Sequence, residues 1–385
     1  MTHDGRSLRE IRQFDFIDAL RGWAFLAVFV NHVNEKTPHA AWVTFLTSGG
    51  ARGVQLFFVV SAFTLFLSFF IRKEKRQEPV EDFFIRRFFR VAPMFWMAAL
   101  FYLTLGGFNK LYGIPHEVNL WRIVSTFLFV NGWHPNTINN VVPGGWTVAV
   151  EMNFYLLLPF FFKHISSLKK ALVLSFSLLV FRVLANVFYA KVLIPPDCPP
   201  LISNLFLYFW LPNQLPVFSL GIILFYLLQD RLKGTSSCPS KEVPRKDSCL
   251  AAALVLLFLL FFRASDFFGT AGVFFPAHFV CAIGFLFLAW ALAIRPFRFF
   301  VNGLTCYTGK VSYSAYLCHF FVLDAIAKHG PGLLAKCNVP FYLSLYYFAV
   351  FFIALVATLF ISTFTYAWIE QPFQSLGKKI IRRYL

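Results

Sequence analysis

Two residues near the start of the chain have the chemistry of a group-transfer site. Arg21 and His32 lie eleven positions apart in the first apolar stretch. On a helix they would lie on one face, about 16 Å apart along the axis. A histidine can take a proton from a hydroxyl and return it, and an arginine suits a phosphate or carboxylate. An arginine reaching the inner lipid headgroups and a histidine at the outer interface is the alternative interpretation.

A second basic motif, Phe-Phe-Ile-Arg-Arg-Phe-Phe-Arg, ends shortly before Pro93. Arg87 and Arg90 are three residues apart and therefore neighbours on one helical face. Paired guanidinium groups beside phenylalanines fit a phosphate-bearing donor such as a nucleotide or coenzyme A. An anchor that binds anionic lipid is the alternative.

A third motif is a Pro-Gly-Gly turn at 143–145, which leads directly into an apolar stretch that carries Glu151. We place Glu151 about one turn below the outer surface, where it would orient a histidine, hold an acceptor hydroxyl or act as a base. A structural hydrogen bond is the alternative. His319 lies near mid-depth of a later stretch, beside Tyr313 and Tyr316, and a packed core histidine is the alternative to a catalyst there.

The composition explains why so few polar residues stand out. The AVILMFWYC residues make up 58% of the 385 residues, charged residues 14%, and phenylalanine alone contributes 53. Soluble chains are about half apolar and about a quarter charged. A polytopic membrane protein is therefore predicted, which excludes a secreted scaffold, a nucleic-acid-binding module and any sizeable extramembrane domain. The seven cysteines have no metal-site or disulfide-framework spacing.

The predicted fold is all-α, with about ten transmembrane helices and one short re-entrant or interfacial helix at 121–131. A span needs about 20 apolar residues, and Pro212 to Pro216 would break one of them. The predicted spans are 16–33, 53–71, 91–107, 148–163, 171–190, 205–228, 249–262, 273–294, 311–327 and 341–368.

Ionisable side chains in the apolar layer are costly and are functional candidates by position. They are Asp18, Arg21, His32, Glu151, Arg182, His278 and His319, with Asp324 near a helix end.

The distribution of lysine and arginine favours one orientation. If ten helices cross from a cytoplasmic N-terminus, the inner segments hold 25 of the 35 Lys and Arg and the outer segments hold 8. We therefore predict cytoplasmic termini at 1–15 and in a basic tail, 371–385, with a transmembrane domain over 16–370. The net charge of +17 then reflects orientation more than a nucleic-acid partner.

These motifs together resemble the acyltransferase-3 family of membrane O-acyltransferases over the length of the chain. Arg21 and His32 match the family's R-x10-H pattern, and Arg87 with Arg90 matches its R-x-x-R. Residues 53–63, which include Ser61, are similar to its G-V-D-L-F-F-V-L-S-G-F segment.

Two further motifs extend the resemblance towards the C-terminus. Trp146 to Pro159 is similar to W-S-L-S-V-E-E-Q-F-Y-L-L-W-P, and 369–373 to the closing E-x-P-F. This chain departs from the pattern at Gln55, Ala62, Ala149, Met152 and Asn153. A mechanism that needs the paired glutamates or the motif's serine is therefore excluded, while Glu151 keeps the first glutamate position.

The resemblance implies transfer of an acyl group, commonly acetyl, from cytoplasmic acyl-CoA to a hydroxyl of a cell-surface or lipid-linked carbohydrate. It implies a bacterial inner membrane, contact with membrane lipid, and no tightly bound cofactor or metal. No room is expected for a fused hydrolase-like domain, so the acyl group would pass directly or through a separate periplasmic partner. The implied roles are catalysis by His32, Glu151 and His319, donor binding by Arg21, Arg87 and Arg90, and acceptor binding or support by Trp146, Asn153, Tyr155 and Ser61.

Two other functions fit the same sequence. Ten spans, a proline-broken helix and a midplane histidine are typical of a transporter, here of a small anionic or sugar-like solute, although no internal repeat is evident. A structural membrane subunit of a polysaccharide assembly complex is the third hypothesis.

Overall fold

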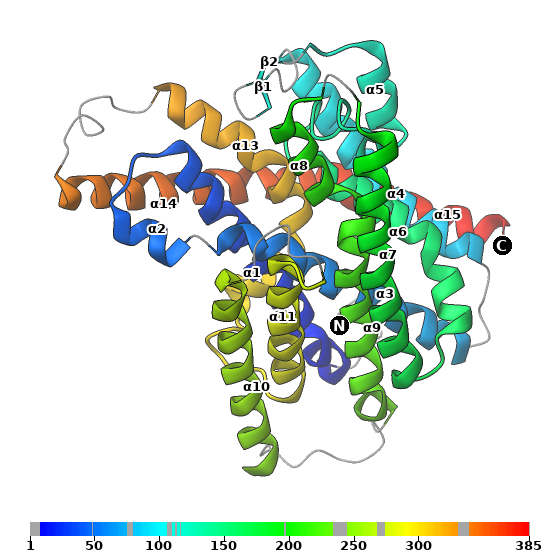
Figure 1. Cartoon of the computed structure of the whole chain (residues 1–385). Helices are drawn as coiled ribbons and strands as arrows, with labels where there is room; N and C mark the ends of the chain where they lie inside the picture. The colour runs from blue at the N-terminus through cyan, green and yellow to red at the C-terminus, as the bar shows by residue number, and fades with distance from the viewer. Residues whose placement is uncertain are drawn as a thin grey trace.

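The computed structural model describes residues 8–47, 49–74, 80–105, 110–111, 114–115, 117–195, 198–233, 245–267, 274–329 and 339–384. Figure 1 shows a bundle of long helices, with the short strands β1 (Lys110–Leu111) and β2 (Ile114–Pro115) forming an antiparallel pair at one end. The α-helices of the first half are α1 (Leu8–Lys36), α2 (Ala41–Thr47), α3 (Gly53–Glu74), α4 (Val80–Thr104), α5 (Leu120–Phe127), α6 (Gly145–His164) and α7 (Leu168–Phe188). Those of the second half are α8 (Pro200–Phe209), α9 (Leu211–Lys233), α10 (Arg245–Ala264), α11 (Ala277–Ile294), α12 (Gly303–Lys310), α13 (Ser312–His329), α14 (Pro340–Thr365) and α15 (Gln371–Tyr384). Short 3-10 or π turns are η1 (Gly50–Arg52), η2 (Asn131–Trp133), η3 (Tyr189–Leu193), η4 (Ser265–Phe267) and η6 (Tyr366–Glu370).

Eight helices of the described residues are long and apolar enough to cross a membrane, and they correspond to eight of the ten predicted spans. The prediction of an all-α polytopic membrane protein is confirmed. The other two predicted spans, 91–107 and 311–327, fall in the helices α4 and α13, which are not among the eight. The predicted short piece 121–131 falls in α5, whose eight residues are too few to cross.

The predicted break in the span 205–228 occurs at Trp210, slightly earlier than expected, and Pro216 lies inside α9. The side-chain amides of Asn213 and Gln214 both donate to the backbone carbonyl of Tyr208, at 3.2 and 2.6 Å. A backbone group freed by the break is therefore satisfied within the protein, as an apolar layer requires.

Two of the ionisable residues that the sequence singled out belong to this break. Arg182 donates from Nε to the Asn213 side chain at 2.5 Å, and His278 donates from Nε2 to the Asn213 carbonyl at 3.1 Å. Both side chains are buried. They bind the α8–α9 junction to the helices α7 and α11, which is a structural role.

Helix α1 occupies the centre of the bundle, where it packs against α3, α12 and α13. Its contact with α12 depends on glycine, because a Cβ at Gly309 would lie 1.7 Å from the Asp18 carbonyl oxygen. A Cβ at Gly22 would likewise lie 2.2 Å from the carbonyl oxygen of Thr305. The two backbones therefore touch, and this contact fixes the position of the turn of α1 that carries Arg21.

The C-terminal segments α14, η6 and α15 follow one another without a gap and run across the bundle in Figure 1. The predicted basic tail, 371–385, is mostly the helix α15, which packs against α4. Glu370, the acidic residue of the E-x-P-F motif, is buried and accepts a hydrogen bond from Ser314 of α13. The motif therefore attaches the long C-terminal helix to α13.

We predict that Gly309→Ala destabilises the protein by about 1–3 kcal/mol, the usual cost of overpacking. The added methyl group would collide with the α1 backbone, which cannot rotate away as a side chain can. Thermal unfolding of the detergent-solubilised protein measures the effect. Gly303→Ala is the matched control, because a Cβ there meets nothing within 4 Å. Equal unfolding temperatures for the two variants would contradict the proposed helix contact.

Candidate functional site

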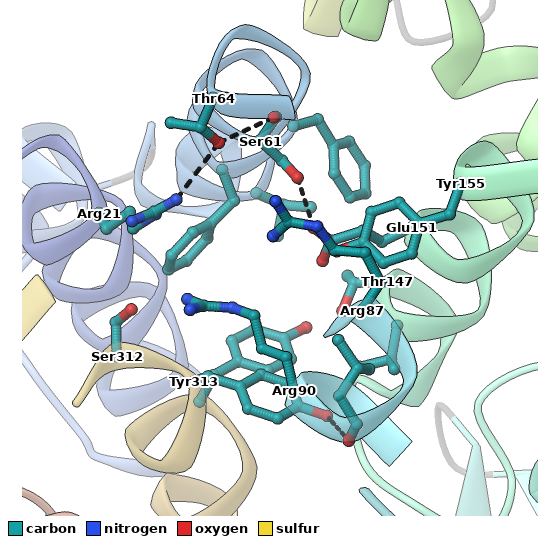
Figure 2. Close-up of a pocket in the computed structure, with 16 residues that line it drawn as sticks. Arg21, Ser61, Thr64, Arg87, Arg90, Thr147, Glu151, Tyr155, Ser312 and Tyr313 are labelled. Atoms are coloured by element: carbon teal, nitrogen blue, oxygen red, sulfur yellow. Dashed lines mark hydrogen bonds between the residues drawn. The ribbon is translucent and has the colours of Figure 1, made fainter. Parts of the chain in front are cut away.

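A cavity of about 90 Å³ lies between the helices α1, α3, α4, α6 and α13 (Figure 2). This volume is several times what one water molecule requires. Its lining residues are Arg21, Val54, Phe57, Phe58, Ser61, Thr64, Arg87, Arg90, Val91, Thr147, Val148, Glu151, Tyr155, Ser312, Tyr313 and Tyr316. The structure therefore brings together all three arginines that the sequence predicted as donor-binding.

Helical spacing explains how two of the helices supply their lining residues. Arg87 and Arg90 share a face of α4, as predicted from their spacing of three. On α6, Thr147, Glu151 and Tyr155 recur every four residues and form one stripe. Each helix thus presents one polar stripe to a shared interior.

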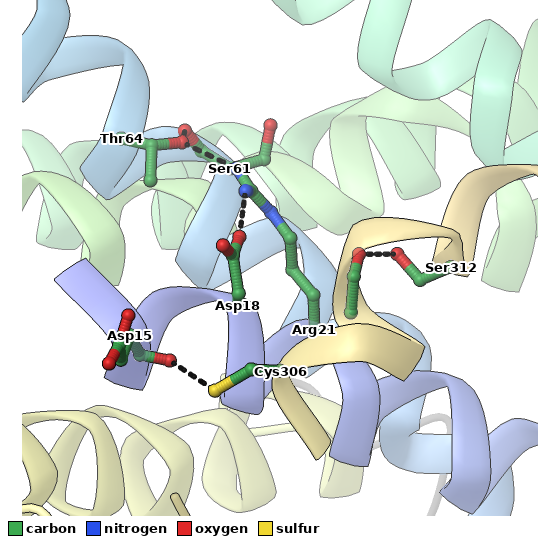
Figure 3. Close-up of polar contacts among 8 residues, drawn as sticks. Asp15, Asp18, Arg21, Ser61, Thr64, Cys306 and Ser312 are labelled. Atoms are coloured by element: carbon green, nitrogen blue, oxygen red, sulfur yellow. Dashed lines mark hydrogen bonds and ion pairs between the residues drawn. The ribbon is translucent and has the colours of Figure 1, made fainter. Parts of the chain in front are cut away.

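Arg21 reaches the cavity from α1, and two partners hold its guanidinium group. Its guanidinium group donates to Asp18, one turn earlier, at 3.2 Å and to Thr64 of α3 at 3.3 Å (Figure 3). Thr64 in turn donates to the carbonyl of Ser61 at 2.9 Å. The side chain is therefore oriented before any ligand arrives.

Arg87 and Arg90 differ from Arg21 in their electrostatic surroundings. Within the described ranges, neither guanidinium group has a carboxylate within ion-pair distance, whereas the adjacent Arg86 pairs with Asp82 at 3.1 Å. The guanidinium carbon of Arg87 lies 5.7 Å from the ring centre of Phe83, and its Nε is buried without an acceptor.

The charges that line the cavity do not balance. Figure 2 shows the three arginine side chains, one from α1 and two from α4, extending into the same space. Glu151 is the one carboxylate among the lining residues. Buried cations need a counter-charge. The cavity is therefore suited to an anion, and planar guanidinium groups suit phosphate.

Glu151 accepts hydrogen bonds from Ser61 at 2.5 Å and from Tyr155 at 2.6 Å, both at the same carboxylate oxygen. Among the described contacts, this carboxylate is therefore held by a serine and a tyrosine and not by a histidine. Because α6 begins at Gly145, Glu151 lies about 9 Å along the helix, level with the arginines. It supplies part of the negative charge of the arginine cavity.

Two other predicted support residues have packing roles and do not line the cavity. Trp146 stacks on Phe209 of α8 with ring centres 4.4 Å apart. Asn153 donates to the carbonyl of Phe129 at 2.8 Å and accepts from Trp133 at 3.1 Å. Asn153 therefore holds the loop between α5 and α6. The other two predicted support residues, Ser61 and Tyr155, line the cavity.

The predicted catalytic histidines meet at the C-terminal end of α1. The ring centres of His32 and His319 lie 5.3 Å apart, and Phe320 packs on both rings. His319 has no exposed surface, whereas the side chain of His32 is 21% exposed. The geometry fits a base that is open to an incoming group on one side and supported by α13 on the other.

Glu35 is a site residue that the sequence reasoning missed. It lies one turn after His32, and its carboxylate accepts a hydrogen bond from His32 Nδ1 at 2.9 Å. The spacing of three residues on one helix was the signal that could have identified the pair. A carboxylate at Nδ1 orients the ring and leaves Nε2 as the basic nitrogen.

A second ion pair holds the same ends of α1 and α13 together. Lys36 and Asp324 approach to 2.7 Å. Tyr316 lies between the two parts of the site, since it lines the cavity and its ring centre lies 5.7 Å from that of His319. Its hydroxyl donates to the carbonyl of Gly144, which has a φ of 73° in the Pro-Gly-Gly turn. The rings of Tyr316 and His319 therefore lie in sequence between the arginine cavity and His32.

No group of three or more His, Cys, Asp or Glu within the described part of the chain could hold a metal ion. The side chains available for chemistry at these two places are arginines, glutamates, histidines, tyrosines and serines.

Comparison with known proteins adds an independent finding. A family model described as an acyltransferase domain matches residues 14–367. An O-acetyltransferase OatA of Staphylococcus aureus (strain NCTC 8325 / PS 47) is 25% identical over 406 residues, which cover 98% of this chain and 60% of that protein. A protein of S. aureus (strain COL) with a provisional O-acetyltransferase name is 25% identical over 97% of this chain and 59% of its own length. The chain thus spans about 60% of the length of these relatives. No solved structure matches the chain significantly.

We predict that inorganic pyrophosphate stabilises the detergent-solubilised protein against thermal unfolding, by about 1.4 kcal/mol at ten times its Kd. Arg87→Ala or Arg90→Ala should remove this stabilisation, because each deletes a guanidinium group that lines the cavity. Arg86→Ala is the matched control, since Arg86 pairs with Asp82 and does not line the cavity. If Arg86→Ala removes the effect and Arg87→Ala does not, the anion binds elsewhere.

Proposed function

Because this chain belongs to the acyltransferase family whose domain it matches from residue 14 to 367, we propose that it is a membrane O-acyltransferase. It moves an acyl group, acetyl in the first instance, from a cytoplasmic acyl-CoA to a hydroxyl of a carbohydrate at the opposite face. The single observation that carries this proposal is that α1 contributes Arg21 to a three-arginine cavity and also carries the pair of His32 and Glu35. The O-acetyltransferase names of the relatives support acetyl as the group.

The arginine cavity is the donor end of the site. Coenzyme A carries a diphosphate and a ribose phosphate, and such groups bind best to guanidinium pairs in a desolvated setting. Arg87 and Arg90 supply two guanidinium groups that have no carboxylate partner among the described residues. Glu151 limits the excess positive charge of the cavity when no donor is bound. The guanidinium group of Arg21 is fixed by Asp18 and Thr64.

The reacting end lies at His32, about 16 Å along α1 from Arg21. That separation suits a donor whose phosphates and thioester are joined by a long flexible arm. His32 Nε2 takes the proton of the acceptor hydroxyl as its oxygen attacks the thioester carbonyl carbon. The carbon–sulfur bond then breaks, and the leaving thiolate recovers the proton from His32. Glu35 stabilises the imidazolium that forms in between.

The distribution of lysine and arginine supports the orientation that we propose. With the N-terminus in the cytoplasm, the lysine- and arginine-rich segments and the arginine cavity lie towards the cytoplasm, where acyl-CoA is available. His32 and the half-exposed Glu35 then lie towards the outer face, where a lipid-linked or cell-surface glycan can approach. This arrangement supports a bacterial cytoplasmic membrane as the location.

The decisive test is acyl transfer by the purified protein in liposomes. Radiolabelled acetyl-CoA is supplied to one face and a panel of glucan, chitin and mannan oligosaccharides to the other. We expect label in an oligosaccharide with the wild-type protein, and a rate about 10²–10⁴-fold lower with His32→Ala, because general-base catalysis is lost.

Each other outcome of the liposome assay has a defined meaning. If His32→Ala transfers at the wild-type rate, the assignment of the base is wrong. Label that crosses into the lumen as an unreacted solute would indicate a transporter. An absence of transfer and of transport with every acceptor would contradict the proposal as a whole.

A second prediction concerns Glu35. Glu35→Gln should lower kcat by about tenfold or more and leave the KM for acetyl-CoA unchanged, because the carboxylate acts on His32 and not on the donor phosphates. Asp324→Asn is the matched control, since this nearby carboxylate pairs with Lys36 and has no contact with His32 among the described residues. A raised KM with unchanged kcat in Glu35→Gln would contradict the role of Glu35.

A further inference from the structure

His319 is a buried residue whose hydrogen bonds define where its proton lies. Its Nδ1 lies 2.7 Å from the carbonyl oxygen of Tyr316 and 3.3 Å from that of Ala315. A carbonyl can only accept, so Nδ1 carries the proton and Nε2 is a bare lone pair. Nε2 is fully buried and has no hydrogen-bond partner within the described part of the chain.

Besides His32 and Tyr316, three of the rings around His319 are phenylalanines. The rings of Phe25, Phe29 and Phe320 pack around His319, with centres 6.1, 6.2 and 4.2 Å away. A water molecule needs two or more polar partners to occupy a buried place, and phenylalanine rings provide none. An unsatisfied acceptor in such a place reduces stability unless a ligand supplies the donor.

The position of His319 indicates which ligand that is. On one side lies Tyr316, which lines the arginine cavity, and on the other side lies His32. The ring centres follow one another at 5.7 and 5.3 Å. A chain that follows this line from the arginines to His32 passes His319.

We propose that His319 Nε2 accepts a hydrogen bond from the amide N–H next to the thioester in the arm of the acyl donor. The inference rests on the proposed function and specifies its donor as a thioester of a cysteamine-type arm. In such an arm, two methylene groups and the sulfur separate the amide nitrogen from the reacting carbonyl carbon. That short spacing matches the neighbouring positions of His319 and His32, so binding the amide at one places the carbonyl at the other.

Passage of the arm requires Tyr316 to move. In the structure its hydroxyl is bound to the carbonyl of Gly144, and its ring lies between the cavity and His319. Rotation of this side chain would break its hydrogen bond of 3.1 Å to Gly144 and its ring contacts with Phe57 and His319. His319 is thus a donor-binding residue and does not take part in proton transfer.

The experiment compares two small acetyl thioesters as donors, with the oligosaccharide accepted in the liposome assay. N,S-diacetylcysteamine has the amide N–H, whereas S-butyl thioacetate has a similar length and lacks it. For the wild-type protein we expect kcat/KM to be about tenfold or more higher for the amide thioester. With the thioester that lacks the amide N–H, the buried acceptor His319 Nε2 stays unpaired.

Three substitutions of His319 isolate the role of Nε2. His319→Phe keeps the ring and removes both nitrogens, and His319→Asn keeps a donor for the Tyr316 carbonyl but no acceptor at the ε position. Both should reduce the rate only with the amide thioester and so abolish the preference. His319→Gln restores an acceptor near the position of Nε2 and should retain much of the preference for the amide thioester. If the phenylalanine variant fails to fold, two results still test the role of Nε2. They are the preference of the wild-type protein and the comparison of the Asn and Gln variants.

The inference is overturned if the wild-type protein does not distinguish the two thioesters, or if every variant slows both equally. The second result would mean that His319 acts on His32 or only on packing. Failure of the proposed function looks different, since the wild-type protein would then transfer acetyl from no thioester, including acetyl-CoA.

Discussion

The constraint on which the rest of this structure depends is the exclusion of charge from an apolar layer. A guanidinium group can be buried among membrane helices only where other helices enclose it and a counter-charge is within reach. Arg21, Arg87 and Arg90 are all enclosed, yet Glu151 is the one carboxylate among the residues that line their cavity. The remaining positive charge is most stable when an anionic ligand is bound. The fold is thus suited to bind an anionic ligand in this cavity.

This arrangement depends on close contact between backbones. Gly22 and Gly309 allow α1 to touch α12, and Gly221 allows α9 to approach the carbonyl of Val59 on α3. Tyr102 and Tyr313 connect α4 and α13 by hydrogen bonds of 3.0 and 2.8 Å. The five helices around the cavity therefore hold their polar stripes in fixed register. Helix α1 then carries Arg21 of the cavity and His32, the proposed donor and reacting ends, on one rigid element.

Much of this was accessible from the sequence. Composition and apolar length predicted the membrane fold, and helical spacing predicted that Arg87 shares a face with Arg90 and that Arg21 shares one with His32. The partners of Glu151, Ser61 and Tyr155, could not be predicted in full, because the contact with Ser61 of α3 depends on how α3 and α6 pack. The partners of Arg182 and His278 come from helices far apart in the chain, and one-dimensional periodicity does not reveal such contacts. Glu35 could have been identified from the sequence, because it lies three residues after His32 on the same helix.

The most direct measurement is an electron cryomicroscopy map of the protein bound to a non-transferable thioether analogue of acetyl-CoA. The account predicts density for the diphosphate between Arg87 and Arg90, and an arm that runs past a displaced Tyr316 to His319 and His32. A nucleotide bound at the His32 end, or at the α8–α9 junction near Arg182, would contradict it.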